Sequence, residues 1–390
     1  MKILQVSSMI PNSLVLSGRK GGGEDFVSNL CTKLADQGHE VTLLLPKFYG
    51  NQTSLICHQN LKPLFIRSIR LPVASFEGNS LPLDFLKMKT TRKYDIVHVH
   101  NICTFLSLYA AMTSKFSAKT KLVVTDHGGG VHLLFPPKMM MRLFDASANV
   151  SNFSLNYLSG LSPSKKHFAV YCGVNLSVLG GDSVASLIKL KQRLNLEGYF
   201  VCLYIGRIMR HKGLEIAVRA LKHLPDTIKI VFVGPFYDLE YLNYLRTLIV
   251  QTNVSERVLF TGDVSAQEKN NLLSICDVLV CPSVYKDVFG GLHPMSELFG
   301  IAKLEGMGSK KPVVVSDVGG LPEGIVDGYN GYIFRSGCSE ELVEKLLLLY
   351  SDSVLQKRIG ELGYKTVKEK FTWDHVANRV ISCYTEIQKG

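Results

Sequence analysis

Short apolar runs rich in Val, Ile and Leu alternate with segments of helical periodicity along almost the whole chain. Such alternation predicts βαβ units and parallel sheets. Within each run the apolar residues are consecutive rather than alternating, which is typical of strands that helices cover on both faces. The runs lie at residues 3–8, 41–46, 95–100, 121–125, 148–151, 168–171, 200–206, 228–234, 258–262, 278–282, 312–316 and 331–334. The predicted fold class is therefore α/β.

The two halves of the chain open in the same way, with a strand, a polar loop and a helix. A new strand starts at Tyr199, after the glycine pair Gly180-Gly181 and a polar helix, so we expect a domain boundary in this region. We predict two Rossmann-like, doubly wound domains at residues 1–178 and 179–372, followed by a helix at 373–390 that packs back on the first domain. Sheets of this type bind ligands at the carboxyl ends of their strands, so we expect the two domains to face a central cleft.

Composition narrows the class of protein. Hydrophobic residues make up 46% of the 390 residues and charged residues 20%, which suits a globular chain of two domains. No apolar run reaches the roughly 18 residues of a membrane-spanning helix, and the first residues resemble a core strand rather than a signal peptide. The nine cysteines are scattered without a Cys-x-x-Cys pair, which argues against a disulfide framework and a zinc site. We therefore expect a cytoplasmic protein.

Positive charge is concentrated in the first half of the chain. Residues 1–175 contain 19 Lys and Arg against 9 Asp and Glu, a balance of +10, whereas the remainder contains 25 against 24, a balance of +1. This bias is compatible with ordinary solvation, an anionic membrane, an anionic lipid-linked substrate or nucleic acid. Nucleic acid ranks last, because no helix-turn-helix, zinc-finger or aromatic-basic RNA motif accompanies the charge.

The most specific stretch runs over residues 282–323. It contains Glu297 and Glu305, separated by seven residues, and the second lies on a predicted helix that precedes a Pro-Val-Val-Val strand. Upstream, residues 206–213 read GRIMRHKG between a predicted strand and a predicted helix. In these motifs the chain resembles glycosyltransferase family 4, whose members are retaining enzymes with the two-domain fold called GT-B. The resemblance covers essentially the whole chain and includes Gly22-Gly23-Glu24, Thr125-Asp126-His127 and Gly173-Val174-Asn175.

The resemblance implies a nucleotide-sugar substrate, which carries a diphosphate, two hydroxyl-rich rings and a base. Arg207 offers a planar fork of donors suited to phosphate, and Lys212 adds a compact positive charge. Both can neutralise the charge that develops on the leaving diphosphate. No Asp-x-Asp motif lies in a comparable loop, so we expect neither a metal ion nor a cofactor.

Two acidic side chains complete the expected donor site. By resemblance, Glu305 accepts hydrogen bonds from the ribose hydroxyls, and Glu297 lies against the transferred sugar. Phe299, Gly300 and Ile301 are expected to present backbone amides to the sugar hydroxyls from a helix N-terminus, where N–H groups are free.

Three further segments contribute to the expected site. By resemblance, His127 at a strand end faces the donor sugar and hydrogen-bonds it in the transition state. Gly22 and Gly23 let the backbone approach a pyrophosphate closely. The base is expected to be recognised through backbone atoms near Gly262 and Val264.

The histidines and the aspartate near His127 receive no such role. Asp126 departs from the family's commoner pattern, in which an acidic residue follows the histidine, so no function is assigned to it. His98 and His100 alternate on a strand without an apparent third metal ligand, and we interpret them as structural or cleft-lining residues.

Together these features predict a retaining hexosyltransferase, with His127, Glu297, Arg207 and Lys212 as its catalytic residues. A sugar-nucleotide epimerase or hydrolase of the same fold and a non-catalytic scaffold subunit are the alternatives. The expected partners are a nucleoside-diphosphate sugar and an anionic acceptor, lipid-linked or glycan. We expect the basic first domain to contact the cytoplasmic face of the membrane. Basic and apolar residues are mixed in its segments 19–20, 85–93 and 136–142.

Overall fold

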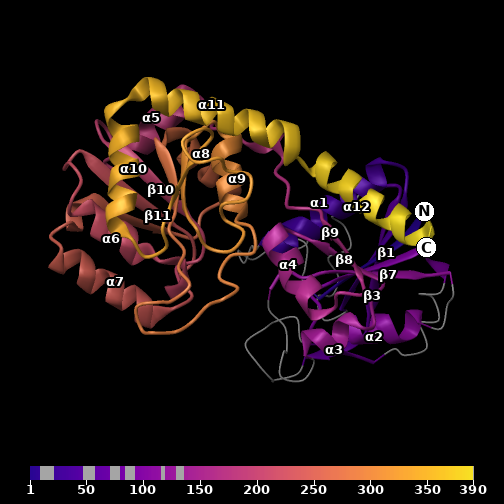
Figure 1. The fold of residues 1–390 in the computed structure, drawn as a ribbon. Helices are drawn as coiled ribbons and strands as arrows, with labels where there is room; N and C mark the ends of the chain where they lie inside the picture. Colours follow the sequence, from indigo (N-terminus) through magenta and orange to yellow (C-terminus); the bar gives the residue numbers. More distant parts are fainter. Residues whose placement is uncertain are drawn as a thin grey trace. The chain divides into compact units, whose positions relative to one another are not determined.

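The computed structural model describes residues 1–8, 22–46, 58–70, 80–83, 93–115, 119–128 and 136–389. The chain divides into an N-terminal unit, Met1–Gly173 with Trp373–Gly390, and a C-terminal unit, Val174–Thr372. The first domain was expected to end at residue 178. The division falls earlier because the Val174 N–H already donates to the Phe371 carbonyl of the C-terminal unit at 2.9 Å. The last helix of the chain, yellow in Figure 1, belongs to the N-terminal unit.

The N-terminal unit is built on a parallel sheet with the strand order β3-β2-β1-β6-β7-β8-β9. Its strands are β1 (Lys2–Ser7), β2 (Glu40–Pro46), β3 (Leu61–Ile66), β6 (Ile96–His100), β7 (Lys121–Thr125), β8 (Ala146–Asn149) and β9 (Lys166–Ala169). A separate antiparallel pair consists of β4 (Ser68–Arg70) and β5 (Ser80–Pro82). The helices are α1 (Gly22–Asp36), α2 (Phe105–Ser114), α3 (Pro137–Met141), α4 (Asn152–Leu161) and α12 (Trp373–Lys389).

Alternate residues of the central strands in this unit face two different layers. Leu4 and Val6 of β1, with Val97 and Val99 of β6, join a core that also contains side chains of α2, α3 and α4. Toward the carboxyl ends of β1 and β6 the residues of the opposite parity are polar and lie on the side of α1 and α12; they are Gln5, Ser7, His98 and His100. These two helices pack against each other and on the sheet (Figure 1). The polar positions therefore lie under two helices that are distant in sequence.

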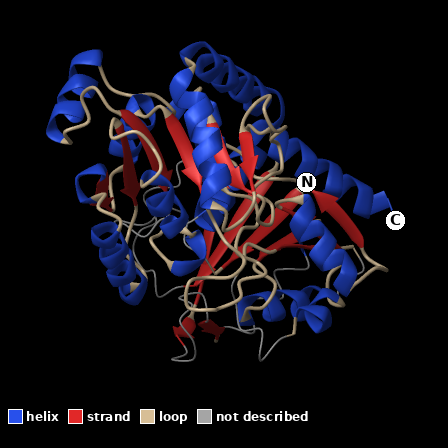
Figure 2. Ribbon diagram, turned by 60° about the vertical axis from the view of Figure 1, so that its left-hand side comes forward, coloured by secondary structure: helices blue, strands red, loops and turns tan. Residues whose placement is uncertain are grey.

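The C-terminal unit contains a second parallel sheet, in the order β12-β11-β10-β13-β14-β15. Its strands are β10 (Phe200–Ile205), β11 (Ile228–Val233), β12 (Val258–Gly262), β13 (Val278–Cys281), β14 (Val313–Ser316) and β15 (Tyr332–Phe334). Its helices are α5 (Val184–Arg193), α6 (Leu214–Leu221), α7 (Leu239–Gln251), α8 (Ala266–Ile275), α9 (Ile301–Gly308), α10 (Ser339–Ser351) and α11 (Ser353–Lys370), with short 3₁₀ turns η5 (Leu176–Val178), η6 (Arg210–Lys212) and η7 (Ser255–Arg257). Figure 2 shows helices on both faces of the sheets.

In both sheets the strand order reverses once, between β1 and β6 in the N-terminal unit and between β10 and β13 in the C-terminal unit. Such a reversal leaves a crevice at the carboxyl ends of the strands, where doubly wound sheets bind ligands.

All twelve apolar runs of the sequence correspond to strands, and the predicted fold class is correct. The pattern missed the short strands β4 and β5 and also β3, whose run LKPLFI is interrupted by Lys62 and Pro63. Proline is tolerated there because β3 lies at the end of the sheet.

Candidate functional site

The loop after β10 begins with a close approach between two strand ends. A Cβ atom on Gly234, after β11, would lie 2.0 Å from the Gly206 carbonyl oxygen, so only glycine fits. The Gly234 N–H in turn donates to Gly262 O, at the end of β12, at 2.8 Å. These contacts join the ends of β10, β11 and β12. Of the predicted residues, Arg207 follows the end of β10 and Gly262 ends β12. Arg207 is exposed, and its guanidinium lies 5.8 Å from the centre of the Tyr237 ring.

Lys212 forms an ion pair with Glu297. Both side chains are largely buried, with exposed fractions of 14% and 13%. The Ser283 hydroxyl, after β13, donates to the same carboxylate oxygen at 2.7 Å. Burial alone would raise the pKa of Glu297, but the Lys212 ammonium and the hydrogen bonds from Lys212 and Ser283 outweigh it and hold the pKa below its ordinary value. The carboxylate is therefore ionised and fixed at the strand-order reversal.

Gly213 makes this arrangement possible. It adopts a left-handed conformation with φ +63° between η6 and α6, and a Cβ there would lie 2.1 Å from the Pro282 carbonyl oxygen. The loop after β10 thus packs directly on the loop after β13, which carries the partner of Lys212. A side chain at Gly213 would push the two loops apart.

A buried lysine of α9 holds the loop that follows β14. Lys303 is fully buried, and its ammonium donates to the carbonyls of Gly320, Leu321 and Glu323 at 2.9, 2.7 and 2.7 Å. The helix starts at Ile301, and Gly300 at its N-cap has φ +83°. The sequence correctly predicted that Phe299, Gly300 and Ile301 lie at a helix N-terminus, where the first N–H groups have no partner within the helix itself.

The second glutamate pairs with a residue that the sequence did not single out. Glu305 on α9 forms an ion pair with Lys269 on α8, with exposed fractions of 13% and 27%. Val264 precedes α8 in the loop that follows β12. The structure therefore places Arg207, Lys212, Gly262, Val264, Glu297, Phe299, Gly300, Ile301 and Glu305 at the carboxyl ends of the C-terminal strands or on the segments that follow them.

His127 lies in the N-terminal unit, two residues after β7. Its backbone N–H donates to Asn101 Oδ1 at 3.1 Å, and its ring centre lies 4.9 Å from that of Phe26. His127 Nε2 lies 3.1 Å from His100 Nδ1. Burial lowers the pKa of His127 to about 3, so the imidazole is neutral at physiological pH.

Behind His127 runs a chain of buried polar side chains. His100 Nε2 lies 2.8 Å from Gln5 Oε1, and the Gln5 amide nitrogen lies 3.0 Å from the hydroxyl of Tyr384 on α12. The same hydroxyl lies 2.7 Å from His98 Nδ1. His98 Nε2 lies 2.8 Å from the Thr125 hydroxyl. Burial lowers the pKa of both His98 and His100, so this chain is uncharged.

Two glycines lie elsewhere than expected. Gly22 and Gly23 form the first turn of α1 rather than a loop. They still lie at a helix start, where the first N–H groups have no partner within the helix itself.

Asp126 and Asn101 shape the loops beside His127. Asp126 is buried and accepts from the Ile102 N–H at 3.1 Å, which is a structural role. Asn101 is buried with φ +71°, and its Nδ2 makes no hydrogen bond to any residue that the structure describes. A buried, unsatisfied donor beside His127 is an additional candidate for contact with a substrate oxygen.

Sequence reasoning thus missed Lys269, Ser283, Gln5 and Tyr384. Ser283 lies within the stretch 282–323 but was given no role, and Lys269, Gln5 and Tyr384 belong to no local motif. Each of the four meets its partner only through the fold. His98 and His100 did carry a signal, since residues two apart on a strand share a face.

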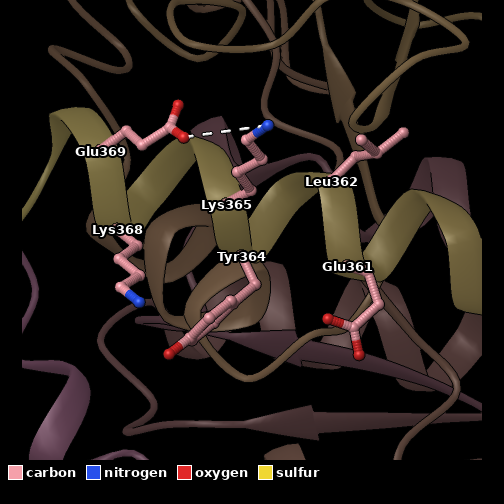
Figure 3. Close-up of a pocket in the computed structure, with 6 residues that line it drawn as sticks. All are labelled: Glu361, Leu362, Tyr364, Lys365, Lys368 and Glu369. Atoms are coloured by element: carbon pink, nitrogen blue, oxygen red, sulfur yellow. Dashed lines mark ion pairs between the residues drawn. The ribbon is translucent and has the colours of Figure 1, made fainter.

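A shallow depression elsewhere on the C-terminal unit contains none of the predicted residues. It is lined by Glu361, Leu362, Tyr364, Lys365, Lys368 and Glu369. Figure 3 shows that all six come from α11 and that Lys365 and Glu369 point toward each other. One helix alone does not form a site that encloses a ligand.

Neither a metal cluster nor a membrane-spanning helix is found in the parts of the chain that the structure describes. Across these ranges no three His, Cys, Asp or Glu side chains gather as metal ligands do. In the same ranges every helix is too short or too polar to cross a bilayer.

Comparison with known proteins identifies related sequences and folds. An uncharacterized glycosyltransferase of Methanocaldococcus jannaschii is 28% identical over 301 residues, which cover 75% of this chain and 76% of that protein. The D-inositol 3-phosphate glycosyltransferase of Xylanimonas cellulosilytica is 26% identical over 410 residues, covering 96% and 93%. The crystal structure of Anabaena HepE in complex with UDP-glucose matches 99% of this chain and 100% of its own, with a TM-score of 0.75 at 21% identity.

Two family models match consecutive parts of the chain. The model for glycosyltransferase family 4 matches residues 20–178, and the model for glycosyl transferases group 1 matches residues 188–366. With the two Rossmann-like units and the matching solved structures, they show that the chain belongs to the group 1, family 4 glycosyltransferases of GT-B fold.

Proposed function

We propose that this glycosyltransferase moves a hexose from a nucleoside-diphosphate sugar to an acceptor hydroxyl with retention of anomeric configuration and without a metal ion. The observation that carries the proposal is the pair of partly buried lysine–glutamate ion pairs, Lys212–Glu297 and Lys269–Glu305, at the strand ends of the C-terminal unit. A substrate with a diphosphate and two polyhydroxylated rings needs both cations and carboxylates, and this edge provides both.

Arg207 and Lys212 are assigned to the diphosphate. As the bond between the anomeric carbon and the phosphate oxygen breaks, negative charge accumulates on the leaving diphosphate, where a fixed cation stabilises it. The acceptor oxygen bonds to the same face of the anomeric carbon, and its proton passes to the leaving phosphate oxygen. Because two side-chain cations supply the charge, the proposal includes no metal ion.

Glu297 and Glu305 are assigned to the sugar and to the ribose. Glu297 is held ionised by Lys212 and Ser283, so it accepts hydrogen bonds from sugar hydroxyls without a change of protonation. Glu305 accepts from the two vicinal hydroxyls of the ribose. Anabaena HepE, which shares the fold, was crystallised in complex with UDP-glucose, and this supports a nucleotide-sugar donor here.

His127 is assigned to the donor sugar as a neutral hydrogen-bonding group. Its lowered pKa makes it a poor base and excludes an imidazolium at neutral pH. It therefore orients the sugar rather than moving a proton.

The acceptor is proposed to be anionic and lipid-linked, bound by the basic N-terminal unit at a membrane surface. Of the mixed basic and apolar segments in the sequence, 19–20 and 85–92 lie outside the described residues. In the remaining segment, Lys138, Met139 and Arg142 are all exposed around α3. Lysine and arginine beside an exposed apolar side chain suit attachment to anionic lipid. The name of the Xylanimonas relative specifies a phosphorylated acceptor, which supports an anionic one here.

The test combines a donor screen with product analysis. UDP-, GDP- and ADP-linked hexoses are each incubated with the protein and a mixture of phosphorylated and lipid-linked acceptors, with and without EDTA. We expect acceptor-dependent release of one nucleoside diphosphate, a product with the donor's anomeric configuration, and full activity in EDTA. Release of free or 2-epimerised sugar without an acceptor would favour an epimerase or hydrolase, and no binding of any nucleotide would favour a scaffold.

A further inference from the structure

In the chain of polar side chains behind His127, the direction of hydrogen bonding is determined at the Thr125 end. The Thr125 hydroxyl lies 2.7 Å from the Ala148 carbonyl oxygen, which can only accept a hydrogen bond. Thr125 therefore uses its single proton on Ala148 and must accept from His98. The Nε2 atom of His98 consequently carries a proton.

The donor and the acceptor of each hydrogen bond between His98 and Gln5 are then also determined. A neutral His98 with a proton on Nε2 has a bare Nδ1, so the Tyr384 hydroxyl donates to it. The single proton of Tyr384 is then used, and the hydroxyl must accept from Gln5. The amide nitrogen of Gln5 therefore faces Tyr384, and Gln5 Oε1 faces His100.

The same logic continues to the ring of His127. Gln5 Oε1 only accepts, so His100 carries its proton on Nε2 and has a bare Nδ1. His127 must donate to that atom from Nε2. The remaining ring atom of His127, Nδ1, is bare, and it makes no hydrogen bond to the described residues.

We propose that Tyr384 and Gln5 are positioning residues that hold His127 in the Nε2–H tautomer, so that Nδ1 accepts a hydrogen bond from a substrate hydroxyl. The last part rests on the proposed function, whereas the tautomer follows from the hydrogen bonds among three neutral imidazole rings. A fixed tautomer makes His127 an acceptor rather than a donor toward the sugar. This selects a hydroxyl at the contacted position and disfavours a deoxy or carbonyl-bearing sugar there.

Tyr384 reaches this chain because α12 is anchored on the N-terminal unit. Gln5 and Tyr384 are 379 positions apart in sequence. Lys33 of α1 forms an ion pair with Asp374 at 2.9 Å, and the Gln37 side chain donates to Asn378 at 2.9 Å. The end of the chain thus supplies the hydroxyl group that orients Gln5.

The first experiment reads the tautomers directly in the wild-type protein. In long-range ¹H–¹⁵N spectra of protein labelled at histidine, a neutral ring shows one protonated and one bare nitrogen. At pH 7 we expect His98, His100 and His127 all to show a proton on Nε2 and a bare Nδ1. A proton on Nδ1 of His127, or a doubly protonated ring, would overturn the proposal.

The second experiment removes one hydroxyl. In Tyr384→Phe the hydroxyl that accepts from the Gln5 amide nitrogen is gone, so the Gln5 amide can turn over and present either its nitrogen or its oxygen to His100. His100 and His127 should then each populate a second tautomer. We expect kcat to fall about tenfold, the size of one lost neutral hydrogen bond, with KM for the donor unchanged. Gln5→Leu, which cuts the chain at the next link, should act in the same way. Unchanged spectra and unchanged kcat in both variants would refute the positioning role.

Tyr94→Phe is the matched control. Tyr94 is a buried tyrosine of the same unit, so it reports the general effect of deleting a hydroxyl, and we expect no change in spectrum or kcat. A wild type that shows the expected tautomers but transfers no sugar would contradict the proposed function while leaving the tautomer assignment intact.

Discussion

The candidate sites at the carboxyl edges of the two sheets differ in charge. At the carboxyl edge of the C-terminal sheet, charged side chains stand in pairs, Lys212 with Glu297 and Lys269 with Glu305. At the corresponding edge of the N-terminal sheet, the polar side chains behind His127 are buried and neutral. Both sites lie where the strand order reverses, so the same topology supports two kinds of chemistry.

This difference in charge suggests a different role in the proposed reaction for each unit. A lysine that is paired with a glutamate in the free protein can form charge-assisted hydrogen bonds to a diphosphate when the ligand binds. The charged site therefore suits a highly charged ligand. A neutral network cannot compensate charge, but it fixes the direction of each hydrogen bond. We therefore expect changes in the C-terminal unit to alter donor affinity and leaving-group stabilisation, and changes in the N-terminal unit to alter orientation.

The largest expected effect is on turnover in Lys212→Ala and Arg207→Ala. Removing one preorganised charge at a leaving group lowers kcat by about 10²–10³-fold. Steady-state kinetics with the best donor of the screen measures this, with Lys365→Ala as control, since Lys365 forms an exposed ion pair on α11 of the same unit. Near-wild-type turnover in both site variants would remove their assignment to the diphosphate.

The two glutamates should separate kinetically. Glu305→Ala is expected to raise KM for the donor roughly tenfold or more with little change in kcat, because ribose contacts are equal in the ground and transition states. Glu297→Ala and His127→Ala are expected mainly to lower kcat, since contacts at the sugar strengthen as the bond breaks. The reverse pattern would mean that the roles of Glu297 and Glu305 are exchanged.

Acid should destabilise the N-terminal unit first. Burial lowers the pKa of His98, His100 and His127 below the ordinary 6.5, to about 3 for His98 and His127, so the unfolded chain binds more protons between these values. Their contribution to stability is complete above pH 6.5 and is lost as pH falls, by at most about 1.4 kcal/mol per pH unit for each histidine.

Hydrogen exchange of the strand amides at pH 7.5, 6.5 and 5.5 resolves the two units. Burial and Lys212 likewise lower the pKa of His211 in the C-terminal unit, to about 3, so that unit should lose some stability as well. We expect faster loss of protection in β6 and β7 than in β13 and β14. Equal loss in both sheets would contradict the contrast between a neutral and a charged site.

The smallest expected effect is on membrane attachment. Each cation near an anionic surface contributes about 1 kcal/mol, so Lys138→Ala and Arg142→Ala should each weaken co-sedimentation with anionic liposomes by less than about tenfold. High salt should abolish binding, and neutral liposomes should not bind. Equal, negligible binding to both kinds of vesicle would refute the membrane contact and favour a soluble phosphorylated acceptor.

The sequence predicted the strands and the charged site better than the neutral one. Buried parallel strands are continuous apolar runs, and Lys212, Glu297 and Glu305 belong to local motifs that a strand–loop–helix pattern places at one edge. The partners Ser283 and Lys269 were missed, because ion pairs and hydrogen bonds between distant segments leave no local spacing.

The neutral site depends on contacts with still larger separation. Gln5 is a single polar residue among the apolar residues Ile3, Leu4 and Val6 of β1, and Tyr384 is one of several aromatic residues near the end of the chain. Only the packing of α12 on α1 brings them together. His98 and His100 could be placed on one face of β6 from sequence, but the direction of their hydrogen bonds required Thr125 and Ala148.

Calorimetric titration with UDP, GDP and ADP tests the division between the two units most directly. The account predicts that the nucleotide that binds the wild type binds His127→Ala with affinity unchanged within about twofold, because His127 is assigned to the sugar alone. The same nucleotide should bind Lys212→Ala at least about tenfold more weakly, as expected for a lost charge-assisted hydrogen bond. Equal loss of affinity in the two variants, or none in Lys212→Ala, would contradict the account.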